Sequence, residues 1–212
     1  MIIGVSGYSG SGKDTVGAII QYLKCVNVGN NAIEDVCKDY QDHEEWLIEQ
    51  SEWEIRKFAG KLKDIASHLT GIDIEDFEDQ EFKKTNLGRE WWTTCDEGYQ
   101  PMTVRDFLQR LGTDALRNNL HENVWVNALM ADYDEQYSDW IITDTRFENE
   151  AKAIKEKGGI IIRVDRPGVK PINPHPSETG LDNWKFDYKI ANVSDLMSLK
   201  STVQTILEHA GI

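Results

Sequence analysis

The chain has 212 residues, of which 40% are hydrophobic and 28% charged, and its formal net charge is −14. This length suffices for one well-buried α/β domain, or for a core domain with a small inserted subdomain, but hardly for two independent domains. The acidic charge argues against a nucleic-acid polymer as a ligand, because binding a phosphate backbone requires clustered Lys and Arg side chains. Small anionic metabolites are compatible if a few cations and helix N-termini converge on one cleft.

Cysteine usage and hydropathy indicate an intracellular protein. Cys25, Cys37 and Cys95 fit neither a CxxC pair nor a metal-ligand spacing, and their odd number does not suit a disulfide framework. We therefore expect reduced thiols. No signal-peptide pattern precedes the first predicted strand, and no apolar run reaches the roughly 18 residues of a membrane-spanning helix. The sequence thus predicts a cytoplasmic protein with no membrane partner.

The chain opens with a predicted strand, a glycine-rich turn and a predicted helix. Residues 1–6 are a short apolar run that predicts a buried strand, and the spacing of apolar residues predicts an amphipathic helix over about 13–24. The turn between them reads GYSGSGKDT over residues 7–15. A strand, a glycine-rich loop with a Lys and a helix form the context that a phosphate-binding P-loop requires.

Each part of this loop has a physical role in holding phosphate. Gly10 and Gly12 allow backbone N–H groups to turn toward phosphate oxygens, and the helix N-terminus adds the positive end of its dipole. Lys13 supplies a point charge for the β- and γ-phosphates. The alternative interpretation is a glycine-rich turn that only reverses the chain.

Asp14 stands where the strict P-loop signature has Ser or Thr, whose hydroxyl binds magnesium. This departure disfavours a GTPase or a motor protein and suits a nucleoside monophosphate kinase, which holds magnesium through water and phosphates. Thr15 follows directly and offers its hydroxyl or amide to the α-phosphate. We expect Asp14 either to act on magnesium through water or to stabilise the helix N-terminus. No residue is predicted to bind the metal directly.

The rest of the chain alternates between predicted strands and helices. We expect strands at 54–58, 140–143, 160–164 and 188–191, and helices at 61–69, 103–120, 123–137, 148–157 and 195–209. Thr103 is expected to cap the helix that it begins. We expect a loop with a short surface helix at 26–51, a solvated helix or loop at 73–81 and a loop at 91–101. A mobile, proline-rich flap is expected at 166–178.

This alternation predicts an α/β protein with the three-layer P-loop NTPase fold, in which helices cover both faces of a central parallel sheet. We expect a single P-loop domain over 1–212. Within it, a substrate-binding insertion is expected at about 72–137 and a short lid at about 166–180.

A second polar group follows the strand predicted at 140–143. The sequence IITDTR places Asp144 and Arg146 directly after an apolar run. Ligands of open α/β sheets bind beyond the carboxyl ends of the strands, where the P-loop also lies. We expect Asp144 to face the metal or the acceptor, and Arg146 the transferring phosphoryl group or the acceptor phosphate. Glu150, one helical turn later, would orient Arg146 or bind the substrate. The alternative to a catalytic role is that Asp144 and Arg146 only form a surface salt bridge at the end of the strand.

Phosphoryl transfer between two anions requires several cations in one cleft. Lys63 and Arg105 follow predicted strands or loops and are expected to point toward such a cleft. Arg110 and Arg117 fit a solvated helix face equally well. Arg166, at the start of the proline-rich flap, is expected to close over the base or the phosphates of ATP.

Trp125 lies in an apolar helical pattern, which favours a place in the core over a stacking platform for a base. His175 has no carboxylate or Cys partner at metal-ligand spacing. The segment 192–195, NVSD, lacks the Lys of a guanine-specificity motif, which further disfavours a GTPase.

Five further segments occur in a characteristic order: FAGKLKDIA (58–66), TVRDFLQRLGTDALR (103–117), NVWVNAL (123–129), IITDTRFENEA (141–151) and RVDRPG (163–168). With the loop at 6–15, they resemble the phage-type deoxynucleoside monophosphate kinases over nearly the full chain, apart from 26–51 and 72–101. The resemblance implies conversion of a deoxynucleoside monophosphate (dNMP) to the diphosphate, with ATP and Mg²⁺. It also implies a homodimer in the cytoplasm of an infected bacterium.

The resemblance assigns roles to individual residues. It implies ATP binding by Gly10, Gly12, Lys13, Asp14 and Thr15. Lys13, Asp144 and Arg146 are the catalytic residues that we predict from the chemistry described above. The resemblance implies substrate contacts from Lys63, Arg105, Gly112, Thr113, Trp125, Asp144, Arg146 and Glu150, and so favours base contact for Trp125. Ser9 and Gly10 replace more basic residues found in some members of the family, so a side-chain contact to phosphate is not implied there.

Two alternatives stay open on the sequence. One is a P-loop kinase of a non-nucleotide phosphate, such as phosphomevalonate or dephospho-coenzyme A, and the other is a non-catalytic nucleotide-sensing module. The presence of Lys13, Asp144 and Arg146 together favours catalysis over sensing. The preferred base, the exclusion of ribose and the oligomeric state are not determined by the sequence.

Overall fold

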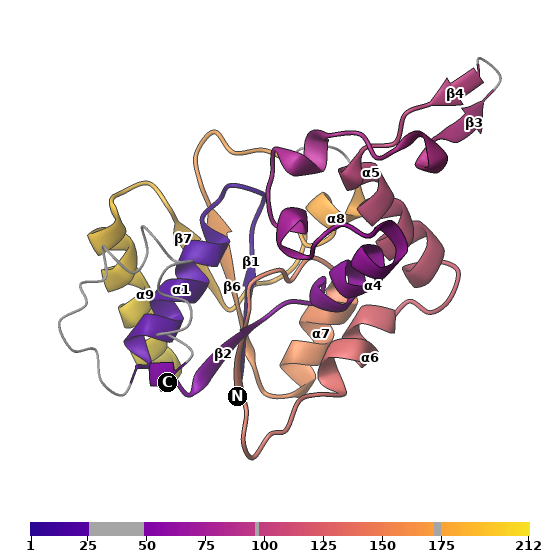
Figure 1. Ribbon diagram of the computed structural model, residues 1–212. Helices are drawn as coiled ribbons and strands as arrows, with labels where there is room; N and C mark the ends of the chain where they lie inside the picture. The colour runs from indigo at the N-terminus through magenta and orange to yellow at the C-terminus, as the bar shows by residue number, and fades with distance from the viewer. Residues whose placement is uncertain (26–48, 96–97, 172–174) are drawn as a thin grey trace. The chain divides into compact units, whose positions relative to one another are not determined.

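The computed structural model describes residues 1–25, 49–95, 98–171 and 175–212 (Figure 1). These residues form two compact units, the first from 1–57 and 132–212 and the second from 58–131. The two units are described separately. Cys37 and nearly all of the predicted loop at 26–51 lie outside the described residues.

The first unit is built on a five-stranded sheet in which every neighbouring pair of strands is parallel. The strand order is β2-β5-β1-β6-β7, so β1 is central. The strands are β1 (Ile2–Ser6), β2 (Trp53–Arg56), β5 (Asp139–Ile142), β6 (Ile160–Asp165) and β7 (Tyr188–Ala191). Because all the strands run the same way, their carboxyl ends meet at one edge of the sheet.

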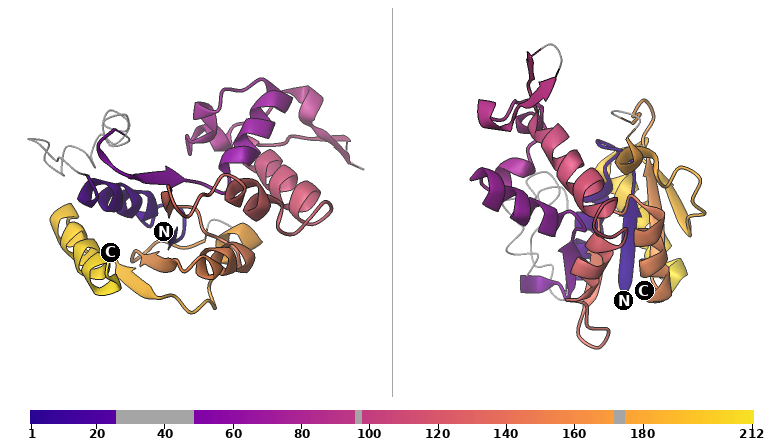
Figure 2. Two further views of the ribbon diagram at one scale, coloured as in Figure 1. Left: turned by 90° about the horizontal axis from the view of Figure 1, so that it is seen from below. Right: turned by 90° about the vertical axis from the view of Figure 1, so that its right-hand side faces the viewer.

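Helices cover both faces of this sheet, as the alternation of side chains along β1 requires. Ile3 and Val5 belong to the core that includes α1 (Lys13–Leu23) and α9 (Leu196–Ala210). Gly4 faces the other way, and a Cβ there would lie 2.8 Å from Cδ1 of Ile154 on α7 (Glu148–Glu156). Figures 1 and 2 show α1 and α9 side by side. The predicted α/β class with a parallel sheet between helices is confirmed.

The second unit is mainly helical. Its elements are α4 (Gly60–Thr70), the 3-10 turns Glu75–Phe77, Phe82–Lys84 and Arg89–Trp91, the hairpin β3 (Thr93–Cys95) and β4 (Gly98–Gln100), α5 (Val104–Gln109), the π-helical segment Arg110–Arg117, and α6 (Val124–Met130). A small apolar core joins them, formed by Ala66, Phe77, Leu87, Met102, Val104 and Phe107. As predicted, Thr103 caps α5, its side chain accepting a hydrogen bond from the backbone N–H of Asp106.

Three predicted elements differ in the structure. The loop expected at 91–101 contains the hairpin of β3 and β4. The helix expected at 123–137 ends at Met130, and the backbone carbonyl of Asp134 accepts from Ser138 N at 2.8 Å, which closes a turn in its place. The single helix expected at 103–120 changes from α to π geometry at Arg110.

Within the described part of the chain, no helix has the length and apolar character that crossing a bilayer requires.

Candidate active site

The glycine-rich loop leaves the carboxyl end of β1 and leads directly into α1. Gly10 and Gly12 have φ angles of 81° and 94°, a left-handed conformation that glycine adopts without steric cost. A lack of space also requires glycine at position 12, because a Cβ there would lie 2.5 Å from Nδ2 of Asn192. That amide nitrogen donates to the backbone carbonyl of Ser11 at 2.9 Å. Asn192, at the end of β7, therefore helps to fix the shape of the loop.

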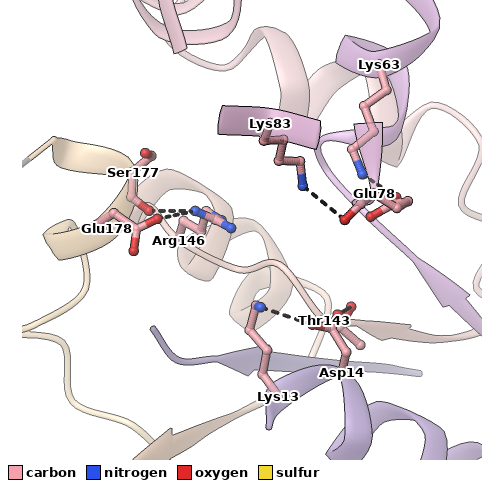
Figure 3. Close-up of polar contacts among 9 residues, drawn as sticks. All are labelled: Lys13, Asp14, Lys63, Glu78, Lys83, Thr143, Arg146, Ser177 and Glu178. Carbon is pink, nitrogen blue, oxygen red and sulfur yellow. Dashed lines mark hydrogen bonds and ion pairs between the residues drawn. The ribbon is translucent and has the colours of Figure 1, made fainter. Parts of the chain in front are cut away.

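The first two side chains of α1 form a polar group with the end of β5. Asp14 accepts hydrogen bonds from Nζ of Lys13 at 3.1 Å and from Oγ1 of Thr143 at 3.0 Å (Figure 3). Partial desolvation raises the pKa of Asp14, but the charges of Lys13 and Lys57 and these two hydrogen bonds outweigh it. The pKa of Asp14 lies below its ordinary value, so its carboxylate is ionised at neutral pH.

The segment after β5 lies at the same sheet edge as the glycine-rich loop, because β1 and β5 are adjacent and parallel. Asp144 is only 7% exposed there. Glu150, at the start of α7, is also buried, and its Oε2 accepts from the backbone N–H groups of Arg146 at 2.8 Å and Phe147 at 3.1 Å. Glu150 thus holds the backbone of Arg146, and its role toward the substrate stays a prediction.

The Arg146 side chain contacts the short helix α8 (Pro176–Thr179), which lies in the predicted flap. Its Nη1 donates to Oε1 of Glu178 at 3.0 Å and to the backbone carbonyl of Ser177 at 3.1 Å (Figure 3). The Arg146 side chain is 35% exposed, whereas that of Glu178 is 4% exposed. The half-buried arginine is therefore anchored by a buried acid.

A cluster around Arg163 also contacts the glycine-rich loop, and sequence reasoning did not find it. The Arg163 guanidinium carbon lies 4.5 Å from the ring centroid of Tyr8 and 5.6 Å from that of Phe186. Tyr8 Oη donates to Oδ1 of Asp182 at 2.7 Å. Desolvation and the Asp182 carboxylate raise the pKa of Tyr8, and its hydroxyl stays protonated. Arg163 also donates from Nε to Oδ1 of the nearby Asp165 at 2.9 Å. The RVDRPG segment was the only sequence signal for Arg163, because Tyr8 and Phe186 are distant from it in the chain.

The predicted substrate contacts Lys63, Arg105, Gly112, Thr113 and Trp125 all belong to the second unit. Lys63 forms an ion pair with Glu78, and Arg105 donates to Gln80 at 3.0 Å. Trp125 is only 5% exposed and its Nε1 donates to the backbone carbonyl of Gly112 at 2.9 Å. Burial agrees with the core interpretation of Trp125, and base contact stays a prediction.

Two further expectations concern the flap and the metal. Arg166 is exposed at the start of the segment after β6, and its backbone carbonyl accepts from Val169 N at 3.1 Å. In the part of the chain that the structure describes, no group of three or more His, Cys, Asp or Glu side chains could hold a metal ion. Asp14 lies in the first turn of α1, directly after the glycine-rich loop, and Asp144 follows β5, so a role of either carboxylate toward a metal stays a prediction.

A parallel α/β sheet whose central strand leads into a glycine-rich loop, a lysine and a helix defines a P-loop protein. The family model for deoxynucleotide monophosphate kinase matches residues 38–203. The chain belongs to the deoxynucleotide monophosphate kinase family. The predicted kinase, its activity on deoxynucleoside monophosphates and the resemblance stated from the motifs are thereby confirmed. The alternative of a kinase for a non-nucleotide phosphate loses its support.

Relatives of viral origin agree with this family. A putative deoxynucleotide monophosphate kinase of Acanthamoeba polyphaga mimivirus is 31% identical over 179 residues, which cover 78% of this chain and 88% of the relative. The deoxynucleotide monophosphate kinase of Enterobacteria phage T4 is 34% identical over 110 residues, covering 50% of this chain and 46% of the relative. That of Escherichia phage RB69 is 27% identical, covering 68% and 57%. The chain thus spans about half the length of the two phage relatives.

Among solved structures, shikimate kinase from Aquifex aeolicus aligns with 100% of this chain and 98% of its own, at a TM-score of 0.45 and 13% identity.

Proposed function

We propose that the chain transfers the γ-phosphoryl group of ATP to the phosphate of a deoxynucleoside monophosphate, giving ADP and the diphosphate. One observation carries the proposal. The glycine-rich loop with Lys13 and the segment with Asp144 and Arg146 leave two adjacent parallel strands at the same end. Two anions can therefore be held between cationic groups of one sheet edge, which is the main requirement of phosphoryl transfer.

In this proposal the loop residues hold ATP. Gly10 and Gly12 present backbone N–H groups to the phosphates, and Lys13 neutralises the β- and γ-phosphates. Thr15, in the first turn of α1, offers its hydroxyl or amide to the α-phosphate. Lys13 lies against Asp14 in the described structure, so its amine is already held beside the loop. Arg166, in the exposed flap, would close over the nucleotide.

Magnesium fits the oxygen atoms that this site offers, since carboxylates and water are its preferred ligands. The ionised Asp14 would accept hydrogen bonds from water on the metal, and Asp144 would face the metal or the acceptor. When bound, the ion neutralises charge on the β- and γ-phosphate oxygens. Thr143 keeps the Asp14 carboxylate oriented by its hydrogen bond.

Arg146 would bind the transferring phosphoryl group or the acceptor phosphate. Guanidinium groups suit this role, because their N–H donors match the oxygens of a phosphate. The substrate contacts that we propose in the second unit are Lys63, Arg105, Gly112, Thr113 and Trp125. Glu150 would contribute through the backbone of Arg146. A homodimer and a place in the host cytoplasm complete the proposal, and both rest on the family resemblance.

A coupled assay of ADP release across the four deoxy and four ribo monophosphates tests the proposed reaction. We expect turnover with at least one deoxynucleoside monophosphate, and its dependence on magnesium and ATP can be measured in the same assay. Lys13→Ala should lower turnover by at least about 100-fold, whereas Lys152→Ala, which removes a surface lysine of α7, should leave it unchanged. Absence of turnover with all eight monophosphates would contradict the proposal. Full activity of Lys13→Ala would favour a catalytic site elsewhere.

A further inference from the structure

Glu178 is the buried acid of the predicted flap, and no sequence pattern singled it out. Its side chain is only 4% exposed, and Oε1 accepts from Nη1 of Arg146 at 3.0 Å. Its other oxygen, Oε2, is buried and has no hydrogen-bond partner within the described residues. Burying a carboxylate with one oxygen unsatisfied costs free energy. A contact that served stability alone would be better made by an apolar side chain.

The short helix that carries Glu178 is fitted closely to the backbone of Arg146. A Cβ on Gly180 would lie 2.8 Å from the carbonyl oxygen of Arg146, closer than side-chain carbons approach backbone oxygens. The φ of Gly180 is −61°, so glycine is needed here for space and not for an unusual backbone conformation. Gly180 and Glu178 therefore bring α8 against Arg146 by two independent contacts.

The Arg146 guanidinium is hydrogen-bonded through one of its nitrogen atoms, and its other two nitrogen atoms are left for a ligand. Nη1 makes both hydrogen bonds to α8, and within the described structure no partner is found for Nη2 or Nε. At 35% exposure the side chain can reach a ligand. Glu150 holds the backbone of the same residue, so both the main chain and the guanidinium are restrained. Such restraint lowers the entropy that a flexible side chain loses when it binds an anion.

We propose that Glu178 is a positioning residue that orients the guanidinium of Arg146, so that its remaining N–H donors face the phosphate. This inference rests on the phosphate-binding role of Arg146 in the proposed function. Glu178 does not touch the substrate and acts through Arg146. It also links the flap to the phosphate site, because any movement of α8 carries the acid that holds the arginine.

Kinetic measurements on two variants test this role. Glu178→Gln keeps the shape of the side chain and removes its charge, and Gly180→Ala adds a methyl group where α8 meets Arg146. Each should lower kcat/KM for the deoxynucleoside monophosphate by about 10–100-fold, a typical loss when a catalytic group is misplaced. Affinity for a fluorescent ADP analogue, which lacks the transferring phosphoryl group, should change by less than about twofold, because the glycine-rich loop is untouched. Glu156→Gln, on an exposed position of α7, is the matched control.

A double-mutant comparison separates positioning from general destabilisation. In an Arg146→Lys background, Glu178→Gln should lower kcat/KM by less than about threefold, because the group that it orients is already lost. Independent losses of equal size in both backgrounds would overturn the proposal. So would kinetics of Glu178→Gln, per folded molecule, that match those of the unmodified chain.

The guanidinium can also be observed without turnover. In ¹⁵N NMR spectra of the full chain without nucleotide, Arg146 should give separate Nη signals because the group is held, and Glu178→Gln should merge them. If the unmodified chain phosphorylated no monophosphate, the proposed function would fail, and these spectra alone would decide whether Glu178 restrains Arg146. Identical Arg146 signals in both proteins would overturn the inference even if the kinase were active.

Discussion

At the scale of single residues, the site depends on ionised side chains held by specific partners. Lys13 contacts Asp14, Asp14 contacts Thr143, and Arg146 contacts Glu178. Each of these pairs joins a residue that the sequence predicted to a partner that restrains it. The predicted residues therefore act as parts of pairs, and their partners are equally useful targets for substitution.

Loss of the Lys13 charge should affect phosphoryl transfer more than folding. We expect Lys13→Ala to lower kcat by at least about 100-fold, since a preorganised charge on the phosphates contributes several kcal/mol to transition-state stabilisation. The melting temperature without nucleotide should change little, because Asp14 and Thr143 keep their own hydrogen bond. Steady-state kinetics and a thermal melt on the same preparation check both statements.

The pKa of Asp14 should respond to Thr143. In Thr143→Val one hydrogen bond to the carboxylate is lost, so the pKa of Asp14 should rise toward its ordinary value, as ¹³C NMR titration of the carboxyl would show. A folded-state pKa below the unfolded one means that ionised Asp14 stabilises the fold at neutral pH. This contribution is lost as the pH falls through the folded-state pKa. An unchanged titration midpoint in Thr143→Val would contradict the role assigned to the hydroxyl.

At the scale of elements, the glycine-rich loop is shaped by the strand that precedes it and by the end of β7. Gly12→Ala would place a methyl group 2.5 Å from Nδ2 of Asn192 and force a side chain into left-handed backbone geometry. We expect a loss of about 1–3 kcal/mol in the free energy of unfolding, measured in urea. Gly168→Ala, which also has a positive φ but open space around it, should cost less and is the control.

The π-helical segment gives a second prediction at this scale. Trp125→Phe removes the hydrogen bond to the Gly112 carbonyl, so we expect a stability loss of about 0.5–1.5 kcal/mol from that bond. Trp184→Phe should cost less, because Trp184 Nε1 is buried without a hydrogen-bond partner within the described residues. Urea denaturation of both variants provides the comparison. Equal losses would show that ring volume dominates over the hydrogen bond.

The sequence predicted those elements whose signals are local. The strands, the glycine-rich loop and the cap at Thr103 follow from periodicity and from residue types that favour one backbone conformation. The anchoring of Arg146 by Glu178, 32 residues away, has no local signal. The contact of Tyr8 with Asp182 joins residues even farther apart. Such contacts depend on the order of the strands, which periodicity alone does not determine.

At the scale of the whole molecule, nucleotide binding should stabilise the fold. A ligand that binds only the folded state adds about 2.7 kcal/mol at a concentration 100 times its Kd. We therefore expect ATP to raise the melting temperature of the unmodified chain and to raise that of Lys13→Ala much less. An equal shift in both proteins, measured by differential scanning calorimetry, would show that ATP is held mainly by other residues.

The hydrogen bond between Asn192 and Ser11 has a consequence for the order in which a ribosome-bound chain matures. The glycine-rich loop is synthesised first, yet its partner on β7 emerges 181 residues later. Strand β1 also cannot pair within the sheet until β5 and β6, its two neighbours from the second half of the chain, have been synthesised. The nucleotide site is therefore among the last parts to be completed during synthesis, although its sequence is the first to be translated. A nascent chain released before Asn192 would carry the whole signature motif and still lack a finished loop.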